Sequence, residues 1–128
     1  MNDFKNYTLL IVDDDEDLRE TLFYTFNKQG FTVLQANSGN AGFEVFQENK
    51  IDLILCDMRM PNGDGLNLLE RVRAKNPEIP VLIFLTGYSD ASDEECIAKG
   101  AKAVYLKPFN QKELLQSVIE SLTQKAAA

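Results

Sequence analysis

The sequence predicts an α/β protein in which helices cover both faces of a five-stranded parallel sheet. Five short, mostly apolar runs alternate with five longer segments of helical periodicity. Runs of this kind are typical of parallel strands that are buried on both faces. Strict alternation of strand and helix requires crossover connections, which are right-handed and place helices on both sides of the sheet. The fold class is therefore a doubly wound α/β sheet.

The strands are expected where short apolar runs lie between helical patterns. Such runs include LLIV, LILC, VLIFL and VYL, each of which is followed directly by a polar residue. We predict strands at Thr8 to Val12, Phe31 to Ala36, Leu53 to Cys56, Val81 to Leu85 and Ala103 to Leu106.

The helices are expected in the five segments that follow these strands. Gly30 and Gly100 come directly after helical stretches, where glycine commonly ends a helix. The predicted helices run from about Asp17 to Gln29, Asn40 to Glu48, Leu66 to Lys75, Ser92 to Lys99 and Gln111 to about Thr123.

Polar residues mark the starts of three of these helices. Ser38 and Ser92 are candidate N-caps. Asn110 with Glu113 has the spacing of a capping box at the last helix.

Length and charge restrict the domain organisation and the partners. A chain of 128 residues is long enough for one domain and too short for two, so we expect residues 1–128 to form a single domain with frayed ends at 1–6 and 124–128. The 13 Lys and Arg residues against 20 Asp and Glu residues give a formal charge of −7, which disfavours nucleic acid and anionic membranes as partners. There is no long apolar stretch and no secretory signal pattern, so we expect a cytoplasmic protein.

The sequence contains no histidine. This excludes serine and cysteine hydrolase triads, histidine-ligated zinc and a phosphohistidine carried by this chain. Cys56 lies in a strand pattern and Cys96 on a helical segment, without a paired spacing. Core packing is therefore the favoured interpretation of both cysteines, and we expect neither a disulfide nor a zinc site.

Polar residues that follow four of the apolar runs form the candidate site. Asp13 and Asp14 follow LLIV, Asp57 follows LILC, Thr86 follows VLIFL, and Lys107 follows VYL. Ligands of open doubly wound sheets bind at the carboxyl ends of the strands. We expect these side chains to converge there on a metal and phosphoryl site.

The acidic run from Asp13 to Asp17 has two interpretations. Carboxylates at the start of a helix complement its dipole, and we favour this interpretation for Asp15, Glu16 and Asp17. Adjacent carboxylates at a strand end repel each other unless a cation is present. For Asp13 and Asp14 we therefore favour a Mg²⁺ site, because Mg²⁺ prefers hard oxygen ligands.

Each remaining candidate also has an ordinary alternative as a turn or surface residue. A carboxylate such as Asp57 beside Mg²⁺ can act as a nucleophile toward phosphorus. The Thr86 hydroxyl can donate a hydrogen bond to a phosphoryl oxygen, and an ammonium such as Lys107 at a buried strand end needs an anionic partner. Residues 62–65, NGDG, are interpreted as a flexible turn, since their spacing matches neither glycine-rich nucleotide fingerprint.

Four motifs in this order and at this spacing resemble the receiver domain of two-component response regulators: LLIVDDDEDLR, LILCDMRMPNGDGL, VLIFLTGY and VYLKPF. The resemblance covers essentially the whole chain. It implies a flavodoxin-like sheet of order 2-1-3-4-5. It also implies that Asp57 accepts a phosphoryl group from the phosphohistidine of a sensor histidine kinase or histidine phosphotransfer protein.

The resemblance further implies a metal-binding role for several residues. Asp14 and Asp57 would ligate Mg²⁺ (or Mn²⁺) directly, together with the backbone carbonyl of Arg59, and Asp13 would act through water.

Other roles implied by the resemblance concern the phosphoryl group itself. Thr86 and Lys107 would hold phosphoryl oxygens, and the Lys107–Pro108 peptide bond would be cis. Arg59 and Tyr88 lie two positions after Asp57 and Thr86 and would tune the loss of the phosphoryl group.

One position departs from the family pattern. Receiver domains commonly carry an aromatic residue three positions before the lysine, where it moves inward upon phosphorylation. Here that position is Val104, and the aromatic residue is Tyr105. Side chains alternate along a strand, so Tyr105 should lie on the opposite side from Val104. The usual aromatic switch is therefore not expected in this chain.

The resemblance also implies partners. The expected output surface is the face of the fourth helix, fifth strand and fifth helix, which would meet a downstream protein or a fused output domain. A phosphorylation-linked dimer is compatible with it. A single-domain regulator, a relay intermediate and a receiver cut from a longer protein all remain open.

Two other classes of function share part of this pattern. An aspartate-nucleophile phosphohydrolase generally needs a second acid two residues after the nucleophile, where this chain has Arg59, so we do not expect a turnover enzyme. A pseudo-receiver that only docks proteins would not bind Mg²⁺, whereas all the acidic residues of the site are present here.

Overall fold

A computed structural model describes residues 4–87 and 93–123 of the chain. The sheet has five parallel strands in the order β2-β1-β3-β4-β5, which confirms the expected fold class and strand order. The strands are β1 (Thr8–Val12), β2 (Thr32–Ala36), β3 (Leu53–Cys56), β4 (Val81–Thr86) and β5 (Ala103–Leu106). The helices are α1 (Glu16–Lys28), α2 (Gly39–Glu48), α3 (Gly65–Lys75), α4 (Asp93–Ala98) and α5 (Gln111–Thr123).

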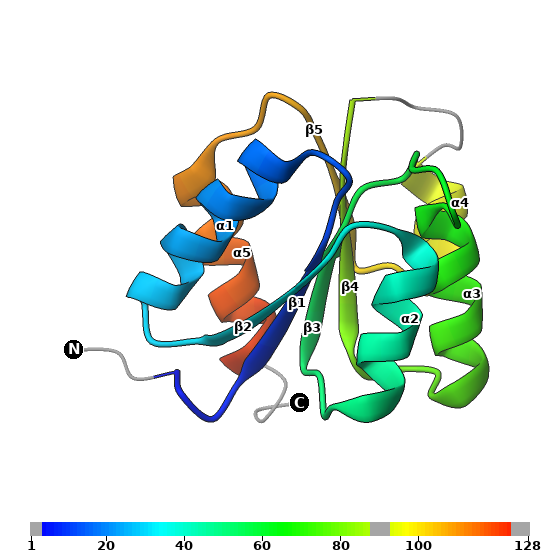
Figure 1. Cartoon of the computed structure of the whole chain (residues 1–128), viewed down its shortest axis with the longest axis horizontal. Coiled ribbons are helices and arrows are strands. Elements are labelled where there is room, and N and C mark those ends of the chain that lie inside the picture. The colour runs from blue at the N-terminus through cyan, green and yellow to red at the C-terminus, as the bar shows by residue number, and fades with distance from the viewer. Residues whose placement is uncertain (1–3, 88–92, 124–128) are drawn as a thin grey trace.

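Helices cover both faces of the sheet (Figure 1). α1 and α5 lie on one face, and α2, α3 and α4 lie on the other. Successive side chains of the central strands point to opposite faces of the sheet. Leu9 and Leu55 belong to the hydrophobic cluster under α1 and α5, whereas Leu10 and Ile54 belong to the cluster under α2, α3 and α4. The sheet grows from β1 to β2 in one direction and from β1 through β3, β4 and β5 in the other. At such a switch point, a crevice lies at the carboxyl ends of the two strands, here β1 and β3.

Helix starts differ from the expected ones where an aspartate forms the cap. α1 begins at Glu16 because the Asp15 side chain accepts a hydrogen bond from the Leu18 N–H at 3.2 Å. α3 begins at Gly65 because Asp64 caps it in the same way. The expectation of a flexible turn over residues 62–65 is therefore wrong for Gly65, which is the first residue of α3, and Asp64 is the N-cap of this helix.

The other capping residues are found where the sequence places them. Ser38 accepts a hydrogen bond from Ala41 N–H at 3.1 Å, and Asn110 accepts one from Glu113 N–H at 3.0 Å. Gly30 and Gly100 have φ angles of 107° and 112°, as the residue after a helix often does. Ser92 lies outside the described residues.

The beginning of the chain is more tightly packed than expected. Residues 1–6 were predicted to be frayed, but Phe4 is only 6% exposed and stacks on Phe31 with ring centroids 4.7 Å apart. This stacking buries apolar surface at the end of the sheet and ties residue 4 to the core. Residues 1–3 and 124–128 lie outside the described part.

The fifth strand is less buried than its sequence predicts. Ala103, Val104 and Tyr105 are half-buried and Leu106 is 58% exposed, because β5 is an edge strand with a neighbour on one side only. The alternation along β5 is confirmed: Val104 packs against the cluster under α2, α3 and α4, and Tyr105 packs against the cluster under α1 and α5.

Both cysteines are buried in the core on the α2, α3 and α4 side, as expected. Within residues 4–87 and 93–123, no helix is long and apolar enough to cross a membrane.

Gly65 allows the start of α3 to lie against the end of β3. Because a larger residue would not fit there, we predict that Gly65→Ala lowers the free energy of unfolding by about 1 to 3 kcal/mol. An added Cβ would overlap the backbone oxygen of Asp57 and would lie 2.8 Å from the Phe84 ring. Urea unfolding measures the effect. Gly87→Ala is the control, because a Cβ there would meet no atom of the described residues within 4 Å. Equal stability of both variants would contradict this account of Gly65.

Candidate functional site

An open pocket of about 610 Å³ lies at the carboxyl edge of the sheet. It is bounded by the loops that follow β1, β3 and β5, so residues far apart in the sequence meet there. The described residues that line it are Asp13, Asp14, Asp15, Asp57, Arg59, Met60, Pro61, Asp64 and Lys107.

Asp13 is held in place by backbone and side-chain contacts. Its N–H continues the sheet by donating to the Ala36 carbonyl at 3.1 Å. One carboxylate oxygen accepts from Asp15 N–H at 2.9 Å, and the other accepts from Lys107 Nζ at 3.0 Å. The residue is only 2% exposed, and this burial raises the pKa of its carboxyl against the lowering effects of Asp15 N–H and Lys107.

Asp57 occupies the equivalent position at the end of β3. Its N–H donates to the Val12 carbonyl at 2.9 Å, which places Asp57 next to Asp13. Its Oδ1 accepts from Met58 N–H at 2.7 Å, while Oδ2 lies 3.4 Å from Lys107 Nζ. The carboxylate is therefore oriented by its own loop and keeps one oxygen toward the lysine.

Asp14 completes an acidic cluster. One ligand oxygen from each of Asp13, Asp14 and Asp57 lies within 4.8 Å of the others. Asp14 is exposed, whereas Asp13 and Asp57 are buried. Asp15, Glu16 and Asp17 instead form the N-cap and first turn of α1, which confirms their interpretation as residues of a helix N-terminus.

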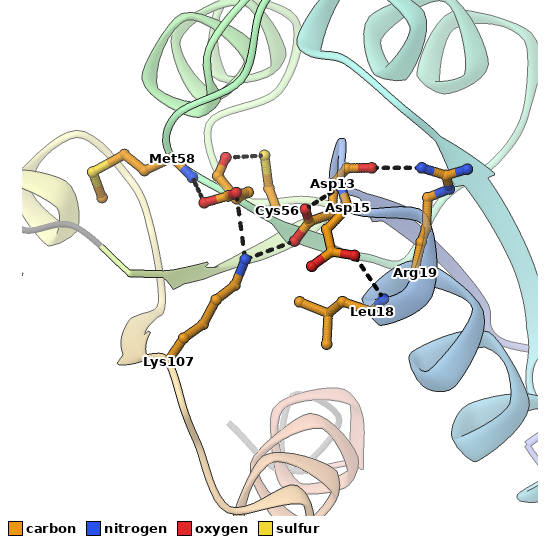
Figure 2. A network of polar contacts seen from close by, with 8 residues as sticks. Asp13, Asp15, Leu18, Arg19, Cys56, Met58 and Lys107 are labelled. Carbon is orange, nitrogen blue, oxygen red and sulfur yellow. Dashed lines mark hydrogen bonds and ion pairs between the residues drawn. The ribbon is translucent and has the colours of Figure 1, made fainter.

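Lys107 extends into the cluster from the end of β5 (Figure 2) and pairs with both Asp13 and Asp57, so the expectation of an anionic partner is confirmed. Burial lowers the pKa of its ammonium, but the hydrogen bonds and charges of the two carboxylates outweigh burial and leave the pKa above its ordinary value. The Lys107–Pro108 peptide bond is cis, as expected.

The remaining candidates differ in their exposure. Thr86 is fully buried at the end of β4, and its carbonyl accepts a hydrogen bond from Lys107 N–H at 2.8 Å. Thr86 is therefore beside the pocket but is not among its lining residues. Arg59 is exposed on the rim. Tyr88 lies outside the described residues.

The donor set of the cluster suits a hard divalent cation. It offers carboxylate oxygens from three aspartates in an open pocket that leaves room for water ligands. Like charges at this separation repel each other, and Lys107 balances only part of that charge. These residues therefore fit Mg²⁺.

Sequence reasoning did not identify Arg19 as part of the site. Its Nη1 donates to the backbone carbonyl of Asp13 at 2.8 Å (Figure 2), and its Nε donates to Gln35 Oε1 at 3.1 Å. Arg19 thus orients the peptide between Asp13 and Asp14. One feature of the sequence indicates this role: Arg19 lies four residues after Asp15, a spacing that brings side chains of a helix together and so places Arg19 near the acidic loop.

A family model described as the response regulator receiver domain matches residues 9–119 of this chain. The chain belongs to this family. It is thus a receiver domain of two-component signalling, and receiver domains are in general phosphoacceptors rather than turnover enzymes. Its Asp13, Asp14 and Asp57 cluster corresponds to the acidic pocket at which receiver domains generally bind Mg²⁺.

Individual relatives support this assignment. Sporulation initiation phosphotransferase F from Bacillus subtilis is 33% identical over 122 residues, which cover 94% of this chain and 98% of that protein. Transcriptional regulatory protein ZraR from Escherichia coli is 38% identical over 116 residues, which cover 90% of this chain but 26% of that protein. The chain spans about a quarter of the length of several curated relatives that it matches.

Solved structures agree with the fold. The response regulator TrrA from Thermotoga maritima, solved in complex with Mg²⁺-BeF, matches with a TM-score of 0.79 and 28% identity, over 89% of this chain and 97% of that one. Receiver domains in general work with histidine kinases and output domains.

The raised pKa of Lys107 predicts a loss of stability at alkaline pH. The ion pair stabilises the fold fully below the ordinary lysine value of 10.5, and this contribution is lost as the pH rises through the higher pKa of the folded state. Asp13 stays ionised throughout that range. The difference in unfolding free energy between wild type and Lys107→Met should therefore stay constant up to about pH 10 and shrink as the pH rises above about 10.5. The exposed Lys102→Met is the control, and a constant difference for Lys107 would contradict the prediction.

Proposed function

We propose that this receiver domain takes a phosphoryl group from a partner's phosphohistidine onto Asp57 in a Mg²⁺-dependent reaction. The partner would be a sensor histidine kinase or a histidine phosphotransfer protein. The observation that carries the proposal is the placement of the Asp57 carboxylate beside Lys107 and within an acidic cluster that opens to solvent. Residues 1–128 contain no histidine, so the phosphohistidine donor lies outside these residues.

In this proposal, the new O–P bond forms at a carboxylate oxygen of Asp57 while the N–P bond of the phosphohistidine breaks. Met58 N–H holds Oδ1 at 2.7 Å, which fixes the orientation of the carboxylate. Lys107, now paired with Asp13 and Asp57, would pair with a phosphoryl oxygen. The Thr86 hydroxyl, at the neighbouring strand end, would hold another phosphoryl oxygen.

The residues proposed to hold Mg²⁺ (or Mn²⁺) are Asp14 and Asp57, together with the backbone carbonyl of Arg59, and Asp13 through a water molecule. The bound ion would neutralise charge on the transferring phosphoryl group. Arg59 and Tyr88 are proposed to flank the acyl phosphate and to limit the approach of hydrolytic water. The exposed position of Arg59 on the rim of the pocket supports its part in this role.

We also propose that residues 1–128 act as one receiver domain in the cytoplasm, with an output surface on α4, β5 and α5. Two large apolar side chains are exposed on these elements: Ile97 is 52% exposed and Leu106 is 58% exposed. Such residues are suited to contact a downstream protein, a fused output domain or a second copy upon phosphorylation.

A small acyl phosphate tests the proposed function without a named partner. The full chain is incubated with it in Mg²⁺ and, separately, in a chelator, and both samples are weighed by intact-protein mass spectrometry. One phosphoryl adduct that forms in Mg²⁺ and not in the chelator is expected. Absence of an adduct together with absence of Mg²⁺ binding would favour a pseudo-receiver that only docks proteins.

The switch is expected to run through Thr86 and α4 rather than through an aromatic swing, because Val104 is a short, branched residue packed under α4. Beryllofluoride with Mg²⁺ stands in for the phosphoryl group, and NMR follows the wild type and Val104→Ala. Chemical shifts should change strongly around Thr86 and α4 and little at the side chain of Tyr105, which packs on the opposite face. Large shifts confined to Tyr105 would show that the switch lies elsewhere.

A further inference from the structure

The loop between β3 and α3, residues 57–64, forms one wall of the acidic pocket. Asp57, Arg59, Met60, Pro61 and Asp64 from this loop all line the pocket. Between Pro61 and Asp64 the loop turns at Asn62 and Gly63, whose φ angles are 64° and 104°. The position of this wall therefore depends on what holds the turn.

The beginning of α2 holds the turn through two backbone hydrogen bonds. Gly39 N–H donates to the Gly63 carbonyl at 2.9 Å, and Asn40 N–H donates to the Asn62 carbonyl at 3.1 Å. The N–H groups in the first turn of a helix have no hydrogen-bond partner within the helix, and here the carbonyl groups of the loop accept hydrogen bonds from two of them. The contact is close, since a Cβ on Gly63 would lie 2.8 Å from Asn40 Oδ1.

A side-chain bridge from α3 strengthens this contact. Arg71 Nη1 donates to Asn40 Oδ1 at 3.1 Å, and the guanidinium carbon lies 4.0 Å from the centre of the Phe43 ring. Phe43 is buried in the core, so it is a fixed platform for the arginine. Arg71 thereby connects α3, which follows the loop, to the residue of α2 that holds the turn. We call these contacts the Arg71–Asn40 bridge.

We propose that Arg71 and Asn40 are positioning residues for the pocket. The Arg71–Asn40 bridge keeps Asn40 in place, Asn40 keeps the turn in place, and the turn keeps residues 58–61 against the acidic cluster. Neither residue lines the pocket, so both act through the loop. This inference rests on the proposed function, because the loop wall matters through the Mg²⁺ and the acyl phosphate that it would surround.

Removal of the bridge should therefore weaken Mg²⁺ binding and change the lifetime of the phosphorylated form. We expect Arg71→Ala and Asn40→Ala each to weaken Mg²⁺ binding roughly threefold to tenfold, the range given by the net contribution of one typical hydrogen bond. The double variant should be no weaker than either single one, because both remove the same contact. Asn40→Asp keeps an acceptor oxygen for Arg71 and should therefore retain the Mg²⁺ affinity of wild type.

The experiment uses the full chain, with Mg²⁺ binding followed by backbone amide NMR and decay of the phosphoryl adduct followed by intact-protein mass spectrometry. Lys75→Ala is the matched control, because it removes the same charge from an exposed position on the same helix. Hydrogen exchange at the Gly39 and Asn40 amides without metal provides an independent measure. Both amides should exchange faster in Arg71→Ala than in Lys75→Ala.

The outcomes separate this inference from the proposed function. If wild type binds Mg²⁺ and Arg71→Ala binds it equally well with the same decay rate, the inference is overturned and the proposed function stands. If wild type neither binds Mg²⁺ nor accepts a phosphoryl group, the proposed function fails and the positioning role fails with it. Equal loss in Asn40→Asp and Asn40→Ala would also overturn the inference, since the acceptor oxygen would then be irrelevant.

Discussion

Asp57→Asn should abolish the phosphoryl adduct that wild type forms with an acyl phosphate and Mg²⁺. An amide oxygen is a far weaker nucleophile than a carboxylate, and the substitution also removes one negative charge from the proposed metal site. The fold should survive, because the asparagine oxygen can still accept the hydrogen bond from Met58 N–H. Intact-protein mass spectrometry measures the loss directly.

The control for this experiment is Asp17→Asn. Asp17 is an exposed acid in the first turn of α1, so this substitution removes the same charge without changing the pocket. The control should be phosphorylated as fully as wild type. An adduct that persists in Asp57→Asn at the wild-type level would show that another residue accepts the phosphoryl group.

Asp14→Ala is expected to weaken Mg²⁺ binding by at least roughly 10- to 100-fold, because that range is typical for the loss of a residue that only supports a metal ligand, and Asp14 is proposed as a direct ligand. Asp14 is the exposed member of the cluster and is the carboxylate most open to an arriving cation. Asp13 and Asp57 are already engaged by Lys107, so they cannot replace its charge fully. Calorimetric titration with Mg²⁺ measures the affinity.

Asp17→Ala again provides the comparison, because it removes an acid from the same run without removing one from the cluster. Its Mg²⁺ affinity should stay close to that of wild type. Equal losses in Asp14→Ala and Asp17→Ala would mean that the acidic run serves mainly to complement the dipole of α1.

Much of the fold was predictable because burial leaves a strong pattern in the sequence. The central strands β1, β3 and β4 are apolar on both faces, because each of them contributes side chains to the hydrophobic clusters on both sides of the sheet. Predictions were weaker where one side of an element is exposed. β5 lies at an edge and is only half-buried, a property that depends on strand order rather than on the local sequence.

The acidic cluster and its lysine were predictable from their positions at strand ends. Parallel strands end at the same edge, so Asp13, Asp57 and Lys107 were expected at one edge once the strands were assigned, and the strand order implied by the family resemblance brings them together. The contacts of Arg19 and Arg71 were not predictable in this way. Both arginines donate to groups on neighbouring elements, and such contacts depend on the path of loops that carry no periodic pattern.

The proposed acceptor residue can be tested most directly by locating the phosphoryl group on the wild-type chain. The protein is phosphorylated with an acyl phosphate in Mg²⁺ and treated with borohydride, which reduces an aspartyl phosphate to homoserine. Tandem mass spectrometry of the peptides then identifies the modified position. The account predicts a single modification at Asp57, absent when Mg²⁺ is chelated. Modification at Asp13, Asp14 or Thr86 in place of Asp57 would contradict it.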